Sequence, residues 1–147
     1  MEGVGSKKNF FEILPHTADI RLRARGNTLK DLFAQAMLGM AYILKKEACQ
    51  NFRPAAPLAV ERKISIKAPN ETVLLIDFLS EILTASYEEK AVFCQVRFEE
   101  ISGKEVRAKI FGIKVEGFDE DIKAVTYHQA EIVRTKDGFE AVVLFDI

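Results

Sequence analysis

The chain has no tryptophan, two cysteines and two histidines among its 147 residues. Cys49 and Cys94 match neither the spacing of a metal site nor a disulfide framework, and each lies in an apolar stretch. We therefore expect two buried thiols in a reducing compartment.

No apolar run approaches the roughly 18 to 20 residues that span a bilayer, and residues 1–8 lack the apolar core of a signal peptide. We expect no membrane contact and a cytoplasmic protein.

The sequence also lacks an excess of positive charge and the common catalytic motifs. Its formal net charge is −1, which argues against a general nucleic-acid coat protein, although a local basic patch is compatible with it. The chain contains no GxxxxGK[ST], GxGxxG, HExxH, GxSxG or paired CxxC motif. Catalysis by the routes that these motifs support is therefore not expected.

The hydrophobic periodicity that is present predicts an α+β fold. Alternation at every second residue predicts strands near 9–14, 19–25, 63–67, 91–99, 104–111, 125–134 and 140–146. A period of 3.6 residues predicts helices from Thr28 to about 44 and from Asn70 to about 90. This order predicts a two-layer α/β sandwich, with two helices packed on one face of a mainly antiparallel or mixed sheet. Residues 1–8 form a predicted flexible leader, and residues 9–147 form a predicted single domain.

The second predicted strand carries a row of arginines. Arg21, Arg23 and Arg25 alternate with apolar residues, so one face of the strand is predicted to be buried and the other basic. The arginine row could contact RNA or an acidic partner, or it could be an ordinary solvated strand face.

Carboxylates adjoin predicted strands at both ends of the chain. Asp19 precedes the second strand, and Asp146 follows the last one, beside the α-carboxylate of Ile147. If the fold brings these groups together, all three would be ionised at neutral pH. Two unit charges about 4 Å apart repel by roughly 4 kcal/mol at an effective dielectric of 20, so a bound cation or a nearby Lys or Arg is needed. Oxygen donors alone suit a hard cation such as Ca²⁺ or Mg²⁺.

Other polar residues could assist such a site. His16 and His128 each neighbour a hydroxyl residue and could act as a general acid or base, or serve a structural role. Lys123 could compensate the carboxylates or contact a phosphate, or simply begin a strand. Asp77 and Glu81 share one stripe of a helix, so we expect one of them, Glu81 rather than Asp77, to have a partner unless the stripe is solvated.

Four short segments, in this order, resemble the archease family. They are His16-Thr17-Ala18-Asp19-Ile20, Leu79-Ser80-Glu81-Ile82-Leu83, Lys123-Ala124-Val125-Thr126-Tyr127-His128 and the terminal Phe145-Asp146-Ile147. The resemblance covers the chain from about Phe10 to its last residue. It implies an α/β sandwich and a protein that is not itself an enzyme.

The resemblance further implies that the chain activates an RtcB-type RNA ligase in tRNA splicing and RNA repair. Family members promote guanylylation of the ligase and its multiple turnover, and RNA is reached only through the ligase. The implied metal ligands are Asp19, Asp146 and Ile147, and both aspartates are critical for activation. Supporting roles fall to His16, Glu81, Lys123 and His128. The implied cofactor is a divalent cation, Ca²⁺ first, with Mg²⁺ or Mn²⁺ as alternatives.

Two other functions stay open. A chaperone or specificity modulator of a tRNA-modifying enzyme, such as a methyltransferase, would depend on the arginine row. An independent metal-dependent hydrolase is a third hypothesis, which has little support because the chain shows no recognisable nucleophile. One segment, residues 113–121, is compact and acidic where many members of the family are longer, which puts in question any partner contact made by that loop.

Overall fold

Helices and strands follow one another in the predicted order. The computed structural model describes residues 9–15 and 19–147, so the expected leader and His16 lie outside the described residues. The elements are β1 (Phe10–Leu14), β2 (Ile20–Gly26), α1 (Leu29–Leu44), β3 (Ala59–Lys67), α2 (Glu71–Glu89), β4 (Ala91–Ile101), β5 (Glu105–Lys114), β6 (Ala124–Thr135) and β7 (Gly138–Asp146). The predicted α+β class is confirmed.

Both helices begin at a residue whose side chain satisfies a free backbone N–H. The Thr28 hydroxyl accepts a hydrogen bond from the Asp31 N–H at 3.1 Å. The Asn70 side-chain oxygen accepts one from the Val73 N–H at 2.9 Å. The second helix ends at Lys90, whose left-handed backbone (φ 51°) turns the chain directly into β4.

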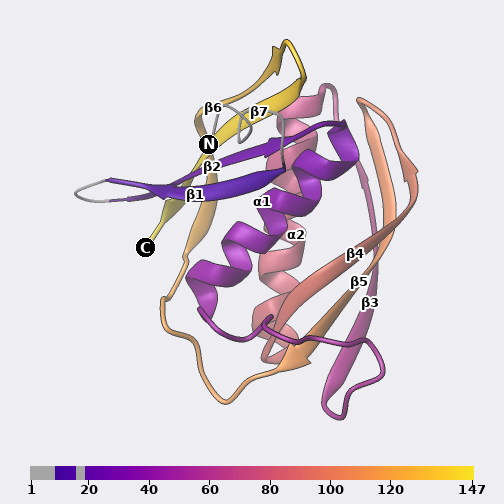
Figure 1. The fold of residues 1–147 in the computed structure, drawn as a ribbon, viewed down its shortest axis with the longest axis vertical. Helices are drawn as coiled ribbons and strands as arrows, with labels where there is room; N and C mark the ends of the chain where they lie inside the picture. Colours follow the sequence, from indigo (N-terminus) through magenta and orange to yellow (C-terminus); the bar gives the residue numbers. More distant parts are fainter. Residues whose placement is uncertain (1–8, 16–18) are drawn as a thin grey trace.

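The strands form two antiparallel sheets rather than the single sheet expected from the sequence. One sheet has the order β1-β2-β7-β6, and the other has the order β3-β5-β4. The helices lie between them, and each helix contacts strands of both sheets (Figure 1). Strand pairing is non-local, so periodicity along the chain predicts the strands but not their division into two sheets.

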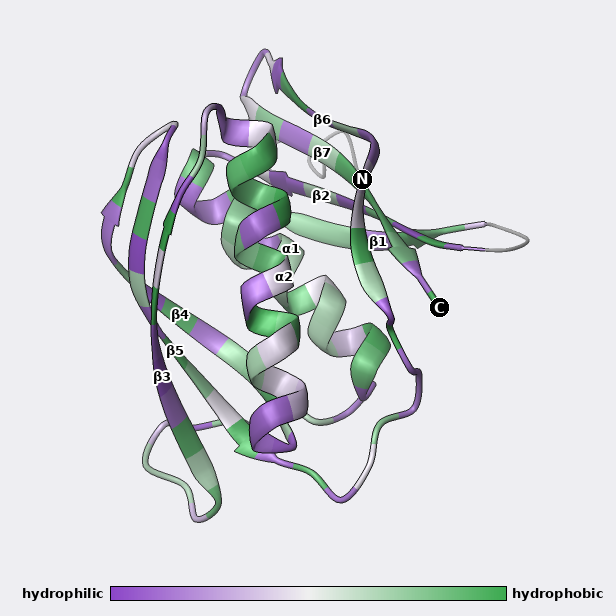
Figure 2. Ribbon diagram, turned by 180° about the vertical axis from the view of Figure 1, so that it is seen from behind, coloured by the Kyte–Doolittle hydropathy of each residue, from purple (hydrophilic) through white to green (hydrophobic). Residues whose placement is uncertain are grey.

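The core lies along the two helices, between the sheets. Phe33 of α1 and Phe78 of α2 are both fully buried, and their ring centroids lie 5.1 Å apart. The methionines Met37 and Met40 are also buried and fill the core. Figure 2 shows hydrophobic residues along much of both helices. Among the described residues, no helix is both long enough and apolar enough to cross a lipid bilayer.

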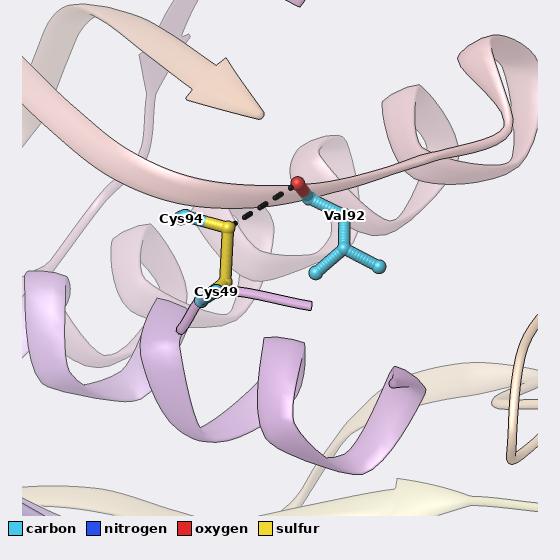
Figure 3. The surroundings of a disulfide bond; sticks show 3 residues. All are labelled: Cys49, Val92 and Cys94. Carbon is cyan, nitrogen blue, oxygen red and sulfur yellow. Dashed lines mark hydrogen bonds between the residues drawn. A yellow bond between two sulfur atoms is a disulfide. The ribbon is translucent and has the colours of Figure 1, made fainter. Parts of the chain in front are cut away.

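The two cysteines form a disulfide, so the prediction of two buried thiols is wrong. Cys49 follows α1, Cys94 lies at an irregular position of β4, and their Cα atoms are 5.4 Å apart (Figure 3). The Cys94 sulfur also lies 3.6 Å from the carbonyl oxygen of Val92, a contact made without donating a proton because a disulfide sulfur carries none. The pairing was missed because the cysteines are 45 residues apart in sequence and only the fold brings them together.

The acidic segment after β5 crosses the C-terminal ends of both helices. Asp119 accepts a hydrogen bond from the Lys46 N–H at 3.0 Å and lies 3.6 Å from the Lys45 ammonium. The Tyr87 hydroxyl donates to the carbonyl oxygen of Ile122 at 2.7 Å. Burial raises the pKa of Tyr87, and the neighbouring Asp121 carboxylate adds to the effect. The segment therefore holds the start of β6 against α2.

Candidate functional carboxylate site

Antiparallel pairing of β2 with β7 brings the two ends of the chain together. Ile20 of β2 lies opposite Phe145 of β7. Because the strands run in opposite directions, the next position in this register sets Asp19 beside Asp146. Figure 1 shows the C-terminus at the end of the sheet where β2 begins. The pairing stops at Ile20 and Phe145, and the proximity of the two aspartates is the expectation that this register supports.

The two aspartates lie on the face of the sheet that points away from the helices. Phe145 is fully buried and Asp146 is exposed, as expected for successive side chains of a strand. Opposed residues of an antiparallel pair share a face, with Cβ atoms about 4.5 to 5.5 Å apart. The two carboxylates can therefore approach one ion from the solvent side.

The chemistry of the donors fits a hard cation. No group of three or more His, Cys, Asp and Glu side chains that could hold a metal is present in residues 9–15 and 19–147. A site here would thus combine the Asp19 and Asp146 side chains with a main-chain oxygen donor at Ile147. Oxygen donors from two carboxylates and the main chain suit Ca²⁺ or Mg²⁺, which complete their coordination with water.

Lys123 is a close neighbour of the carboxylates along the backbone. Its N–H donates a hydrogen bond to the carbonyl oxygen of Asp146 at 2.7 Å, and Ala124 then pairs with Asp146 in the ladder. The Lys123 side chain is exposed and makes no ion pair among the described residues. It is therefore available to a negatively charged ligand or partner that approaches Asp146.

His128 lies farther along β6, where the strand is irregular. The register with β7 shifts between Thr126 and Glu131, and Gln129 has a left-handed backbone with φ 60°. The His128 N–H donates to the Thr126 hydroxyl at 3.2 Å, and its imidazole is exposed without a hydrogen-bond partner in the described part of the chain. The structure does not bring His128 into contact with the carboxylates.

On α2, Asp77 rather than Glu81 has the partner, contrary to the expectation. The hydroxyl of Tyr127 in β6 donates a hydrogen bond to the Asp77 carboxylate. This bond raises the pKa of Tyr127, with smaller contributions from burial and from the charge of Asp77. Glu81 is exposed and lines a polar pocket with Asp77, Ser65 and Lys67, apart from the carboxylates at the end of β7. The bond between Tyr127 and Asp77 was missed because 50 residues separate its partners.

The arginine row is largely engaged within the molecule. Arg25 is 4% exposed and its guanidinium lies 3.4 Å from both the Asn27 side-chain oxygen and the Thr135 hydroxyl. Arg23 pairs with Glu12 at 2.7 Å and with Glu140 at 3.6 Å. Two of the three arginines, Arg23 and Arg25, are therefore engaged within the molecule.

Comparison with known proteins identifies the family. The chain matches the Archease protein family over residues 11–147. It is 35% identical to a protein named archease from Methanosarcina acetivorans, over 93% of this chain and 95% of the relative. It is 31% identical to an archease-like protein from Dictyostelium discoideum, over 99% of this chain and 97% of the relative.

Solved structures share the fold. Protein 1598 of Methanobacterium thermoautotrophicum superposes with a TM-score of 0.69 at 24% identity, over 93% of this chain and 98% of that one. A Thermotoga maritima archease, described as a possible chaperone, superposes with a TM-score of 0.60 at 20% identity, over 92% of this chain and 96% of that one. The family match and the relatives above 30% identity together show that the chain belongs to the archease family.

Proposed function

We propose that this protein is a non-catalytic activator of an RtcB-type RNA ligase in tRNA splicing and RNA repair, acting in the cytoplasm. The observation that supports the proposal is the pairing of Ile20 with Phe145, whose register, continued by one position, leads to Asp19 and Asp146. Asp19, Asp146 and Ile147 are the proposed ligands of a divalent cation, Ca²⁺ in the first instance. Mg²⁺ and Mn²⁺ have the same preference for oxygen ligands and are the alternatives.

The position of the carboxylates suits insertion into a partner. Asp146 is exposed and Asp19 is half-buried, at the end of the β2-β7 pair. A cation held there would supply charge neutralisation beside a triphosphate, which favours nucleotidyl transfer. The exposed Lys123 ammonium adjoins Asp146 and would attract the same phosphates.

Guanylylation of the ligase tests the proposal. Purified ligase is incubated with radiolabelled GTP, with and without this protein, and the labelled ligase is measured after a fixed time. We expect wild type to increase the labelled fraction, and both Asp19→Ala and Asp146→Ala to remove that increase. The control is Glu116→Ala, which removes an exposed carboxylate that makes no ion pair among the described residues. Full stimulation by both aspartate variants would refute the carboxylate mechanism.

The description of the Thermotoga maritima archease as a possible chaperone suggests one alternative function. In that function the protein would modulate a tRNA-modifying enzyme, such as a methyltransferase, through surface contact. Two of the three arginines that this alternative needs, Arg23 and Arg25, are engaged with Glu12, Glu140 and Thr135. We therefore favour the ligase activator.

A further inference from the structure

The outer face of the β3-β5-β4 sheet carries a row of cations that crosses all three strands. Lys63 of β3 lies opposite Lys109 of β5, and Lys109 lies opposite Arg97 of β4. Their neighbours in sequence, Ile64 and Ile110, are buried against the helices, so the three cations share the solvent face. Adjacent strands are about 4.8 Å apart, and the row therefore spans roughly 10 Å.

The charges of this row are only partly compensated. Lys63 and Arg97 are exposed and form no ion pair within the described residues. Lys109 lies 3.6 Å from the Glu61 carboxylate, which is itself half exposed. Like charges directly opposite one another in a sheet are destabilising. Glu100 and Glu105 lie on the same face but are near Arg107 rather than the row. The three cations of the row therefore have one carboxylate within ion-pair distance, and an external anion would reduce the repulsion between them.

Arg97 is held in an orientation that suits a nucleobase. Its guanidinium lies 5.5 Å from the centre of the Phe111 ring, and Phe111 is 9% exposed. A cation held over an aromatic ring is fixed by the ring's quadrupole. Arg97 is exposed, and unstacked RNA bases stack on guanidinium planes as they do on aromatic side chains.

The same face lacks what a protein partner requires. The large hydrophobic side chains that are exposed in the described chain are Ile13, Tyr42, Leu58, Tyr127 and Val133, and none of them belongs to β3, β4 or β5. Protein interfaces depend on buried aromatic and aliphatic anchors, whereas binding to a phosphate backbone is mainly electrostatic. The observations favour a nucleic-acid strand over an acidic protein.

We propose that the row formed by Lys63, Lys109 and Arg97 binds the phosphate backbone of single-stranded RNA, with a base stacked on Arg97. This goes beyond the proposed activation of the ligase, because it gives the protein its own contact with RNA on a different sheet from the carboxylates. It also revises the expectation that RNA is reached only through the ligase.

Fluorescence anisotropy with a labelled 12-nucleotide polyuridine RNA tests this proposal without the ligase. With three phosphates contacted, log K should fall with log salt concentration at a slope of about −2. The double variant Lys63→Gln/Arg97→Gln should bind about tenfold more weakly, and the slope should fall in magnitude to about −0.7, as expected for one remaining phosphate contact. Its thermal midpoint should be equal to or above that of wild type, because repulsion across the strands is relieved.

The matched control is Lys30→Gln/Lys136→Gln, which removes two exposed cations that lie on α1 and in the turn between β6 and β7. This control should bind the RNA as wild type does. Equal weakening in both double variants, or no binding by wild type at low salt, would overturn the proposal. So would a Lys63→Gln/Arg97→Gln protein that binds RNA normally but no longer associates with the purified ligase, since the row would then be a protein interface. The RNA-binding measurements do not include the ligase. They therefore test the cation row separately from the proposed activation, whatever Asp146→Ala does to that activation.

Discussion

At the scale of single residues, the candidate site depends on the register of one strand pair. The sequence predicts carboxylates at the ends of two strands, because Asp19 and Asp146 each adjoin an alternating apolar run. It cannot predict that these two strands are neighbours, since β2 and β7 are separated by most of the chain. The structure supplies that step by pairing Ile20 with Phe145.

Removing one carboxylate should have opposite effects on the metal-free and metal-bound protein. Asp19→Asn should leave the thermal midpoint of metal-free protein unchanged or slightly raised, because it relieves repulsion with Asp146. Wild type should be stabilised by Ca²⁺, by about 2.7 kcal/mol at one hundred times the dissociation constant. The variant should lose most of that stabilisation. Differential scanning calorimetry with Ca²⁺ and with a chelator measures both effects, and equal stabilisation of the two proteins would exclude Asp19 as a ligand.

The hydrogen bond between Tyr127 and Asp77 should make stability sensitive to alkaline pH. The pKa of Tyr127 is raised in the folded protein, so the folded state holds its proton more tightly than the unfolded state. The resulting stability is fully present below the ordinary tyrosine pKa of about 10 and is lost as the pH rises through the higher folded value. In urea denaturation between pH 8 and pH 11, the free energy of unfolding should fall less steeply with rising pH for Tyr127→Phe than for wild type. An unchanged decline would show that this hydrogen bond is not coupled to folding.

At the scale of elements, features that depend on a few neighbouring residues can be predicted from the sequence, whereas contacts between distant segments cannot. The caps at Thr28 and Asn70 and the helix periods act within a few residues, and the helices that they delimit are confirmed. The division into two sheets, the disulfide and the bond from Tyr127 to Asp77 join segments far apart in sequence. These three features follow from the packing of the helices between the sheets, and a single sequence carries no direct signal for them.

The disulfide should contribute measurably to stability because it joins the segment after α1 to β4. It closes a loop with a sequence separation of 45 residues. Removal of a native disulfide that closes a loop of this length costs about 2 to 5 kcal/mol. The double variant Cys49→Ser/Cys94→Ser should therefore unfold at a lower guanidinium concentration than oxidised wild type.

A reductant provides the control for this prediction. Wild type treated with dithiothreitol should unfold at nearly the same guanidinium concentration as the double serine variant, and the variant itself should not respond to the reductant. If oxidised and reduced wild type unfold at the same concentration, the disulfide does not constrain the unfolded chain as expected.

At the scale of the whole molecule, the proposed activities lie on opposite sides of the helical layer. The carboxylates adjoin the β1-β2-β7-β6 sheet, and the cation row lies on the outer face of the β3-β5-β4 sheet. The helices separate the two sheets (Figure 1). Variants of the two surfaces share no side-chain contact, so their effects should be additive. The protein could thus present a carboxylate-bound cation to a ligase while its other side is in contact with an RNA strand.

The most direct test of the central claim is multiple-turnover ligation of a 3′-phosphate RNA by an RtcB-type ligase, with this protein present in substoichiometric amounts. We predict that wild type and Glu116→Ala sustain many turnovers, whereas Asp146→Ala leaves the ligase at about one turnover and keeps the wild-type circular dichroism spectrum. Equal stimulation by wild type and Asp146→Ala would contradict the account, because activation would then not depend on the carboxylates that the pairing of β2 with β7 brings together.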